Sequence, residues 1–162
     1  MRYTVLASAL FGVGLLAIAP AQAQQKPLPY GAPISLEQAQ KITAAAIAQS
    51  AKMGLAEAVA IVEPNGQLVS YAKMDGTQYG SKVVAMNKAK SAALFRRPTQ
   101  VFNDLLAKGP AFTYLLTLEG ANAVPGGLLI VAGGKIVGGI GCSGGTGAED
   151  IEICQAGLNA LK

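Results

Sequence analysis

A pair of glycines, Gly133 and Gly134, stands between two short apolar runs, and this pattern constrains the fold more than any other. Because glycine adopts a positive φ at no steric cost, a Gly-Gly pair in this position predicts a two-residue hairpin turn. The flanking runs, 128–132 and 135–142, are therefore expected to be antiparallel strands. The second run is rich in glycine, which predicts that another group approaches its backbone closely.

The second strand leads into a bend over residues 143–147 and then into the last helix of the chain. Thr146 can cap this helix, and Glu149 follows at the spacing of a capping box. Two interpretations stay open. The N–H groups at the helix start can bind an anion, or the bend can satisfy these groups with its own side chains.

A second hairpin is predicted earlier in the chain, where Asn65-Gly66 separates the apolar run 58–62 from the alternating run 67–74. The spacing of apolar residues and the capping signals predict four helices. They run from Ser35 to Gly54, from Ser81 to about Phe95, from Val101 to Leu106, and from about Gly147 to Leu161. Helices that alternate with hairpins favour an α+β fold with an antiparallel sheet over a parallel βαβ repeat.

The start of the chain has the features of a secretory signal peptide, residues 1–23. Arg2 precedes an apolar stretch too short to span a bilayer, and Ala21-Gln22-Ala23 fits a cleavage site. The mature chain then begins with a proline-containing, extended lead-in, residues 24–34, followed by one domain, residues 35–162. We therefore expect a periplasmic or secreted protein.

The chain contains no histidine. Its absence excludes Ser-His-Asp and Cys-His nucleophile systems, His-based zinc sites and His-ligated haem. The net charge of +4 is too mild and too dispersed to indicate a nucleic-acid partner. We expect no metal site and, after cleavage of the signal peptide, no association with a membrane.

Two cysteines, Cys142 and Cys154, lie at the end of a predicted strand and in the last helix. Packing of that helix on its strand can bring them together, and a disulfide suits an oxidising compartment. They can equally be two small buried apolar residues. No CxxC motif or basic partner indicates a catalytic or metal-binding thiol.

Charged residues near predicted turns and helix faces are the other candidates for a site. Lys73 and Asp75 flank a turn at the end of the strand 67–74, where they can orient a ligand or stay solvated. Lys88 and Lys90 lie on different faces of one helix, so one of them can point at a cleft while the other meets water, or both can be solvated.

Four segments of the chain form a set with a characteristic order and spacing. They are Ala60 to Val69, Lys73-Met74-Asp75-Gly76, Lys88 to Ala92 with Arg97-Pro98-Thr99, and Pro125-Gly126-Gly127 with Gly138 to Gly145. This set resembles the GlcG/HbpS family of haem-binding and haem-degrading-type proteins from about Ser35 to Lys162. The resemblance implies a profilin-like fold, with a five-stranded antiparallel sheet flanked by helices, and self-association into homo-oligomers. It implies no single enzyme activity.

On this basis we expect a binding cleft for haem or a small anionic metabolite, walled by the Lys73 turn, the Lys88 helix and the bend 143–147. The candidate ligand-binding residues are Lys73, Asp75, Lys88, Gly141, Ser143, Gly144, Gly145 and Thr146. Glycines would let the ligand approach the backbone, and the lysines would offset its charge. Without histidine, haem would be held through its propionates.

Two other functions stay open. One is an enzyme or accessory protein of hydroxy-acid metabolism of the glycolate type, in which Asp75 and Lys88 act as an acid–base pair. The other is an oligomeric sensor-accessory module. Its interfaces would be the patch 112–118 and a small-residue helix face formed by Ala85, Ala89, Ala92 and Ala93.

Overall fold

The computed structural model describes residues 26–161, so the predicted signal peptide, residues 1–23, lies outside the described residues. The elements in chain order are α1 (Leu36–Lys52), β1 (Ala58–Val62), β2 (Leu68–Lys73), α2 (Ser81–Phe95), α3 (Gln100–Leu106), the 3-10 helix η1 (Pro110–Thr117), β3 (Gly127–Ala132), β4 (Lys135–Ser143) and α4 (Gly147–Asn159). All helices and strands predicted from local sequence patterns form, with ends within two residues of the prediction. The α+β fold class is confirmed.

The strands form one antiparallel sheet in the order β2-β1-β4-β3. The prediction of five strands is wrong for the part of the chain that the structure describes, which has four. Between α3 and β3 the chain forms η1, which begins with Pro110 after a positive-φ Gly109. The lead-in adds a single parallel bridge, between Tyr30 and Ile136.

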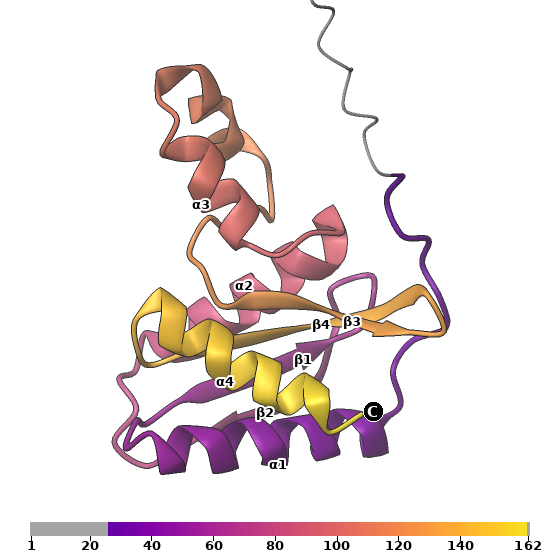
Figure 1. The fold of residues 1–162 in the computed structure, drawn as a ribbon, viewed down its shortest axis with the longest axis vertical. Helices are drawn as coiled ribbons and strands as arrows, with labels where there is room; N and C mark the ends of the chain where they lie inside the picture. The colour runs from indigo at the N-terminus through magenta and orange to yellow at the C-terminus, as the bar shows by residue number, and fades with distance from the viewer. Residues whose placement is uncertain (1–25, 162) are drawn as a thin grey trace, which may run out of the picture.

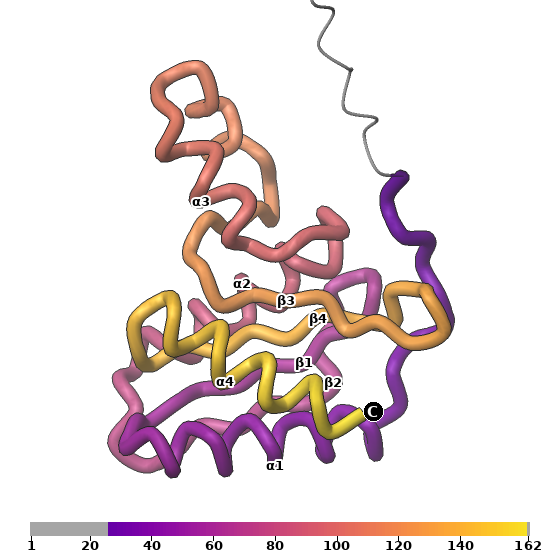
Figure 2. Tube along the Cα trace, in the orientation of Figure 1, coloured from indigo at the N-terminus to yellow at the C-terminus, as the bar shows by residue number. Residues whose placement is uncertain are grey.

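Helices cover both faces of the sheet, so the fold has three layers (Figures 1 and 2). On one face, α1 and α4 pack against apolar side chains of β1, β3 and β4, such as Val59, Ile130 and Ile140. On the other face lies α2, which contacts β1, β3 and β4. Because side chains alternate across a strand, Ala58, Ala60 and Val62 of β1 point to α2 instead.

The glycines of β4 allow α2 to lie unusually close to the sheet. A Cβ at Gly139 would collide with the carbonyl oxygen of Ala89, and one at Gly141 with that of Ala85. The close approach predicted for this strand is therefore made by the backbone of α2. The small-residue face of α2, formed by Ala85, Ala89, Ala92 and Ala93, is fully buried in this contact. Its use as an interface is thus a wrong prediction, because the sheet already covers it.

The lead-in is fixed to the sheet. The backbone N–H groups of Gly31 and Ile34 donate to the carbonyl oxygens of Ile136 and Val137, at 2.8 Å each. The hydroxyl of Tyr30 donates to carbonyl oxygens at the end of α2, and the Arg96 guanidinium lies over its ring. These contacts tie the start of the described chain to both β4 and α2.

The segment α3–η1 stands away from the sheet, as Figure 1 shows. Several of its large apolar side chains are exposed, among them Tyr114 at 56% and Leu116 at 70%. Among residues 26–161, no helix is long and apolar enough to cross a membrane, and no group of three or more Cys, Asp or Glu side chains could hold a metal ion.

Candidate functional site

A turn at the end of β2 carries the candidate residues Lys73 and Asp75. The turn is tied to the start of β1, because the Met74 N–H donates to the Glu57 carbonyl oxygen at 2.9 Å and the Thr77 hydroxyl lies 3.1 Å from the same oxygen. Gly76 has a φ of 80°, which suits glycine and closes the turn. The turn is therefore a rigid support for the side chains it presents.

An open hollow of about 440 Å³ lies at this turn, lined by Ile47, Ala72, Lys73, Met74 and Asp75. The Lys73 ammonium donates to the carbonyl oxygens of Met74 at 3.1 Å and Thr77 at 3.4 Å. It remains exposed, so it keeps a donor for a bound anion. The hollow thus combines apolar walls with one cation and one exposed carboxylate.

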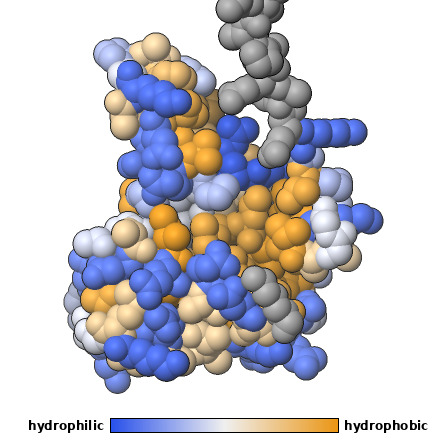
Figure 3. All heavy atoms as spheres, in the orientation of Figure 1, coloured by the Kyte–Doolittle hydropathy of each residue, from blue (hydrophilic) through white to orange (hydrophobic). Residues whose placement is uncertain are grey.

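A second hollow, of about 210 Å³, lies between β3 and α4, on the face that Figure 3 shows with an apolar area beside α4. Its lining residues are Leu129, Ile130, Val131, Gln155, Leu158 and Leu161. No charged side chain lines it. It therefore offers nothing to offset the charge of an anionic ligand.

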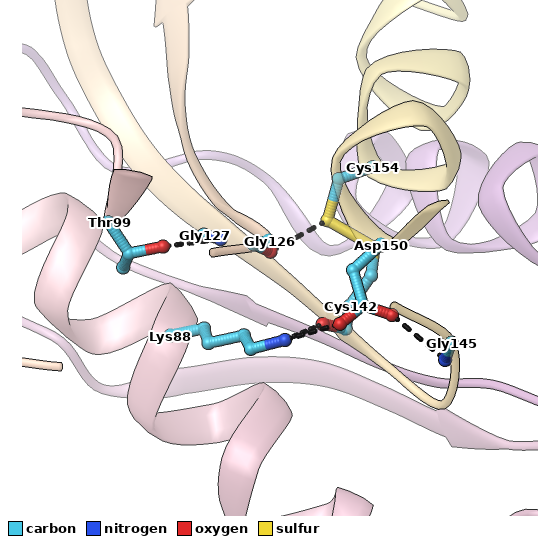
Figure 4. Close-up of a disulfide and its surroundings, with 8 residues drawn as sticks. All are labelled: Lys88, Thr99, Gly126, Gly127, Cys142, Gly145, Asp150 and Cys154. Atoms are coloured by element: carbon cyan, nitrogen blue, oxygen red, sulfur yellow. Dashed lines mark hydrogen bonds and ion pairs between the residues drawn. A yellow bond between two sulfur atoms is a disulfide. The ribbon is translucent and has the colours of Figure 1, made fainter. Parts of the chain in front are cut away.

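Lys88 is fully engaged inside the fold. Its ammonium lies 2.5 Å from Asp150 Oδ2 and donates to the Cys142 carbonyl oxygen at 2.9 Å, with only 1% of its side chain exposed (Figure 4). The side chain starts on α2 and reaches α4 past Gly126, where a Cβ would stand 2.9 Å from the Lys88 nitrogen. Lys88 therefore joins the two helix layers at the end of the sheet.

Two N–H groups of the bend 143–147 are bound by carboxylate side chains from the first turn of α4. The Gly145 N–H donates to Asp150 Oδ1 at 3.0 Å, and the Thr146 N–H donates to Glu149 Oε2 at 2.7 Å. The Thr146 hydroxyl accepts from the Glu149 N–H, which completes the predicted capping box. Of the two interpretations of this bend, the structure has the self-capped one.

The structure joins Cys142 and Cys154 in a disulfide, the pairing that the sequence left open (Figure 4). Their Cα atoms are 5.8 Å apart, within the usual range. Cys154 Sγ also lies 3.3 Å from the Gly126 carbonyl oxygen. Because a disulfide sulfur carries no proton, this second approach is a packing contact.

Glu57 is the residue of this region that the sequence did not reveal. It directly precedes β1, its side chain is fully buried, and neither carboxyl oxygen has a hydrogen-bond partner within the described residues. Burial, followed by the proximity of Asp150, raises the pKa of Glu57 to about 8. No local sequence pattern predicts the burial of Glu57, since a Glu beside a turn is ordinarily solvated.

The predicted site residues thus fall into two groups. Lys73 and Asp75 line the open hollow. The others lie in or beside the buried ion pair and the self-capped bend, and they are Lys88, Gly141, Ser143, Gly144, Gly145 and Thr146. The structure does not bring the two groups to one opening, and no contact joins Asp75 to Lys88 among the described residues. Ligand binding by these residues stays a prediction.

The fold and these sites define a class: a small α+β domain with a four-stranded antiparallel sheet and a rigid turn beside an open hollow. Residues 34–159 match the family described as "Haem degrading protein HbpS-like". Because the match covers most of the chain, the protein belongs to this family, as its motifs indicated.

Relatives in sequence and structure agree with this assignment. The protein GlcG of Escherichia coli K12 is 29% identical over 68% of this chain and 81% of its own. A double mutant of Streptomyces reticuli HbpS is 31% identical, with a TM-score of 0.75 over 90% of this chain and 99% of its own. A structure described as a PduOC:heme complex is 24% identical, with a TM-score of 0.73 over 79% and 94%. At this identity, the last similarity is evidence for the fold only.

Proposed function

We propose that this protein is an exported small-ligand-binding protein whose ligand is haem, held at the hollow beside Lys73. The observation that carries the proposal is an apolar hollow with one exposed cation, in a chain of the HbpS-like family. A solved relative in complex with heme adds support. Export rests on the signal-peptide pattern of residues 1–23.

The residues of the hollow suit a porphyrin in polarity and charge. Ile47, Ala72 and Met74 offer apolar surface to a flat ring, and the Lys73 ammonium can pair with a propionate. The lining holds no histidine, and the Met74 sulfur lies 3.4 Å from the Glu57 N–H, which donates to it. We therefore propose that the apolar walls and Lys73 hold the haem, and we name no residue as a ligand of its iron.

Titration of haem into the purified mature protein, followed in the Soret band, tests the proposal. We expect a saturable shift, and we expect Lys73→Glu to weaken binding at least fivefold, because it reverses the charge offered to the propionate. Lys135→Glu is the matched control, since this exposed lysine lies at the start of β4, outside the hollow.

The two variants test separately whether haem is the ligand and whether the hollow is its binding site. A saturable shift that Lys73→Glu and Lys135→Glu change equally would keep haem as the ligand and overturn the hollow as its site. No shift at micromolar haem would overturn haem as the ligand. Calorimetric titration with glycolate then tests whether Lys73 binds a small anionic metabolite in place of haem.

We also infer that the protein self-associates through the segment α3–η1. Three large apolar side chains of or next to η1, those of Tyr114, Leu116 and Leu118, are exposed on a segment that stands clear of the sheet (Figure 1). Exposed apolar side chains that cluster in this way mark interaction surfaces. Sedimentation velocity should give an oligomer that Leu116→Ser dissociates, whereas a monomeric wild type would overturn the inference.

A further inference from the structure

Glu57 is held by two segments of the chain, one at its backbone and one at its carboxyl group. Its own N–H and carbonyl oxygen are bound to the Met74 turn of β2, and the bend 143–147 lies on its carboxyl group. A Cβ at Gly144 would stand 2.9 Å from Glu57 Oε1, so only a glycine lets the bend close this far. The carboxyl therefore lies directly beneath the bend.

Two charged groups face this carboxyl, Asp150 from α4 and Lys88 from α2. Lys88 is already paired with Asp150, and Asp150 also accepts the Gly145 N–H. A neutral Glu57 can donate its proton toward Asp150. The single negative charge of Asp150 then remains paired with the single positive charge of Lys88. An ionised Glu57 would place two buried carboxylates beside one ammonium, with both of its own oxygens lacking a donor.

We propose that the Glu57 carboxyl is a pH-sensitive latch: while neutral it lets the bend 143–147 and the first turn of α4 close over the end of the sheet, and when ionised it opens them. Opening lets water reach the carboxylate, which removes the cost of burying its charge. The Gly145 and Thr146 N–H groups then lose their bonds to Asp150 and Glu149. The latch involves no ligand, so it stands or falls independently of the haem proposal.

The direction of the pH dependence follows from linkage. In the closed state burial and Asp150 raise the pKa of Glu57 to about 8, whereas in the open state it returns toward its ordinary value of 4.5. Between these values the closed state holds one proton more than the open state. The equilibrium constant for opening therefore rises about tenfold per pH unit in this range and levels off above it.

Hydrogen exchange of the full mature chain at the Gly145 and Thr146 amides tests the latch. After correction for the intrinsic exchange rate, we expect opening to increase about 50-fold from pH 6 to pH 8 in the wild type, because the rise begins to level off at pH 8. In Glu57→Gln, which keeps the shape and a hydrogen-bond donor, we expect no pH dependence. Glu149→Gln is the control: the pKa of Glu149 is lowered by the Thr146 backbone, so this variant should lose protection at every pH and keep the wild-type slope.

A wild-type profile without slope, or the same slope in Glu57→Gln, would overturn the latch. If Glu57→Gln does not fold, the wild type labelled with ¹³C at its Glu carboxyl carbons decides instead. A Glu57 signal that titrates near pH 8 together with the amide signals of the bend supports the latch. A midpoint below pH 6, or a titration that leaves the bend amides unchanged, refutes it.

Discussion

Lys88 and Asp150, 62 residues apart in the sequence, form an ion pair of 2.5 Å that spans from α2 on one face of the sheet to α4 on the other. Both side chains are almost completely buried, and the Cys142 carbonyl oxygen and the Gly145 N–H complete their hydrogen bonds. In a buried pair of this kind, each charge is compensated only while its partner is present. It therefore holds the layers together at the end of the sheet where the bend lies.

Removal of one partner is expected to destabilise the fold strongly. Lys88→Met leaves Asp150 buried without a cation and beside Glu57, so we expect a loss of about 3–5 kcal/mol in the free energy of unfolding. The double variant Lys88→Met with Asp150→Asn leaves no unpaired charge and should cost clearly less than the sum of the single changes. Urea denaturation of the four proteins measures this coupling. Additive single effects would show that the pair does not act as a unit.

Close packing of α2 on β4 gives a second prediction. Gly141→Ala places a methyl group against the Ala85 carbonyl oxygen and the Ala89 nitrogen, so we expect a loss of about 1–3 kcal/mol or a displaced α2. Gly80→Ala is the matched control, because no atom lies within 4 Å of the added Cβ and its φ of −62° suits alanine. Thermal unfolding followed by circular dichroism compares them. Equal melting temperatures would contradict the packing described for β4.

Local signals explain why the elements of the fold could be predicted. The turns at Asn65-Gly66 and Gly133-Gly134, and the capping boxes at Ser35 and Thr146, each depend on residues a few positions apart. The count of five strands rests on the family resemblance and on no local signal. Its fifth strand is absent from the described residues.

The site could be predicted only in part, because its decisive contacts are distant in the sequence. Lys88 looks like a surface lysine until α2 is placed on glycines 126, 127 and 141, which leave a path for it to Asp150. Glu57 has no sequence signal, because its burial depends on the bend that closes over it. Lys73 and Asp75 stand on a local turn, and both line an open hollow.

The capping box at the start of α4 predicts a dependence on acid pH. The Thr146 backbone and hydroxyl lower the pKa of Glu149 below its ordinary value of 4.5. This contribution to stability is therefore present above pH 4.5 and is lost as the pH falls through the lowered pKa of the folded state. Glu149→Gln should be less stable than the wild type at pH 7 and equally stable at pH 2, by urea denaturation. A difference that persists unchanged at pH 2 would contradict an ionic cap.

The Cys142–Cys154 disulfide fixes α4 to β4 across a sequence separation of 12 residues. A loop of this length restricts the unfolded chain, so its loss is expected to cost roughly 2–3 kcal/mol. The midpoint of urea unfolding should fall in dithiothreitol for the wild type. In Cys142→Ala with Cys154→Ala it should be low from the start and unaffected by the reductant. Because Lys88 and Asp150 still join α2 to α4 without the disulfide, the reduced protein should remain folded at 25 °C. Complete unfolding on reduction would mean that the ion pair adds little to the attachment of α4.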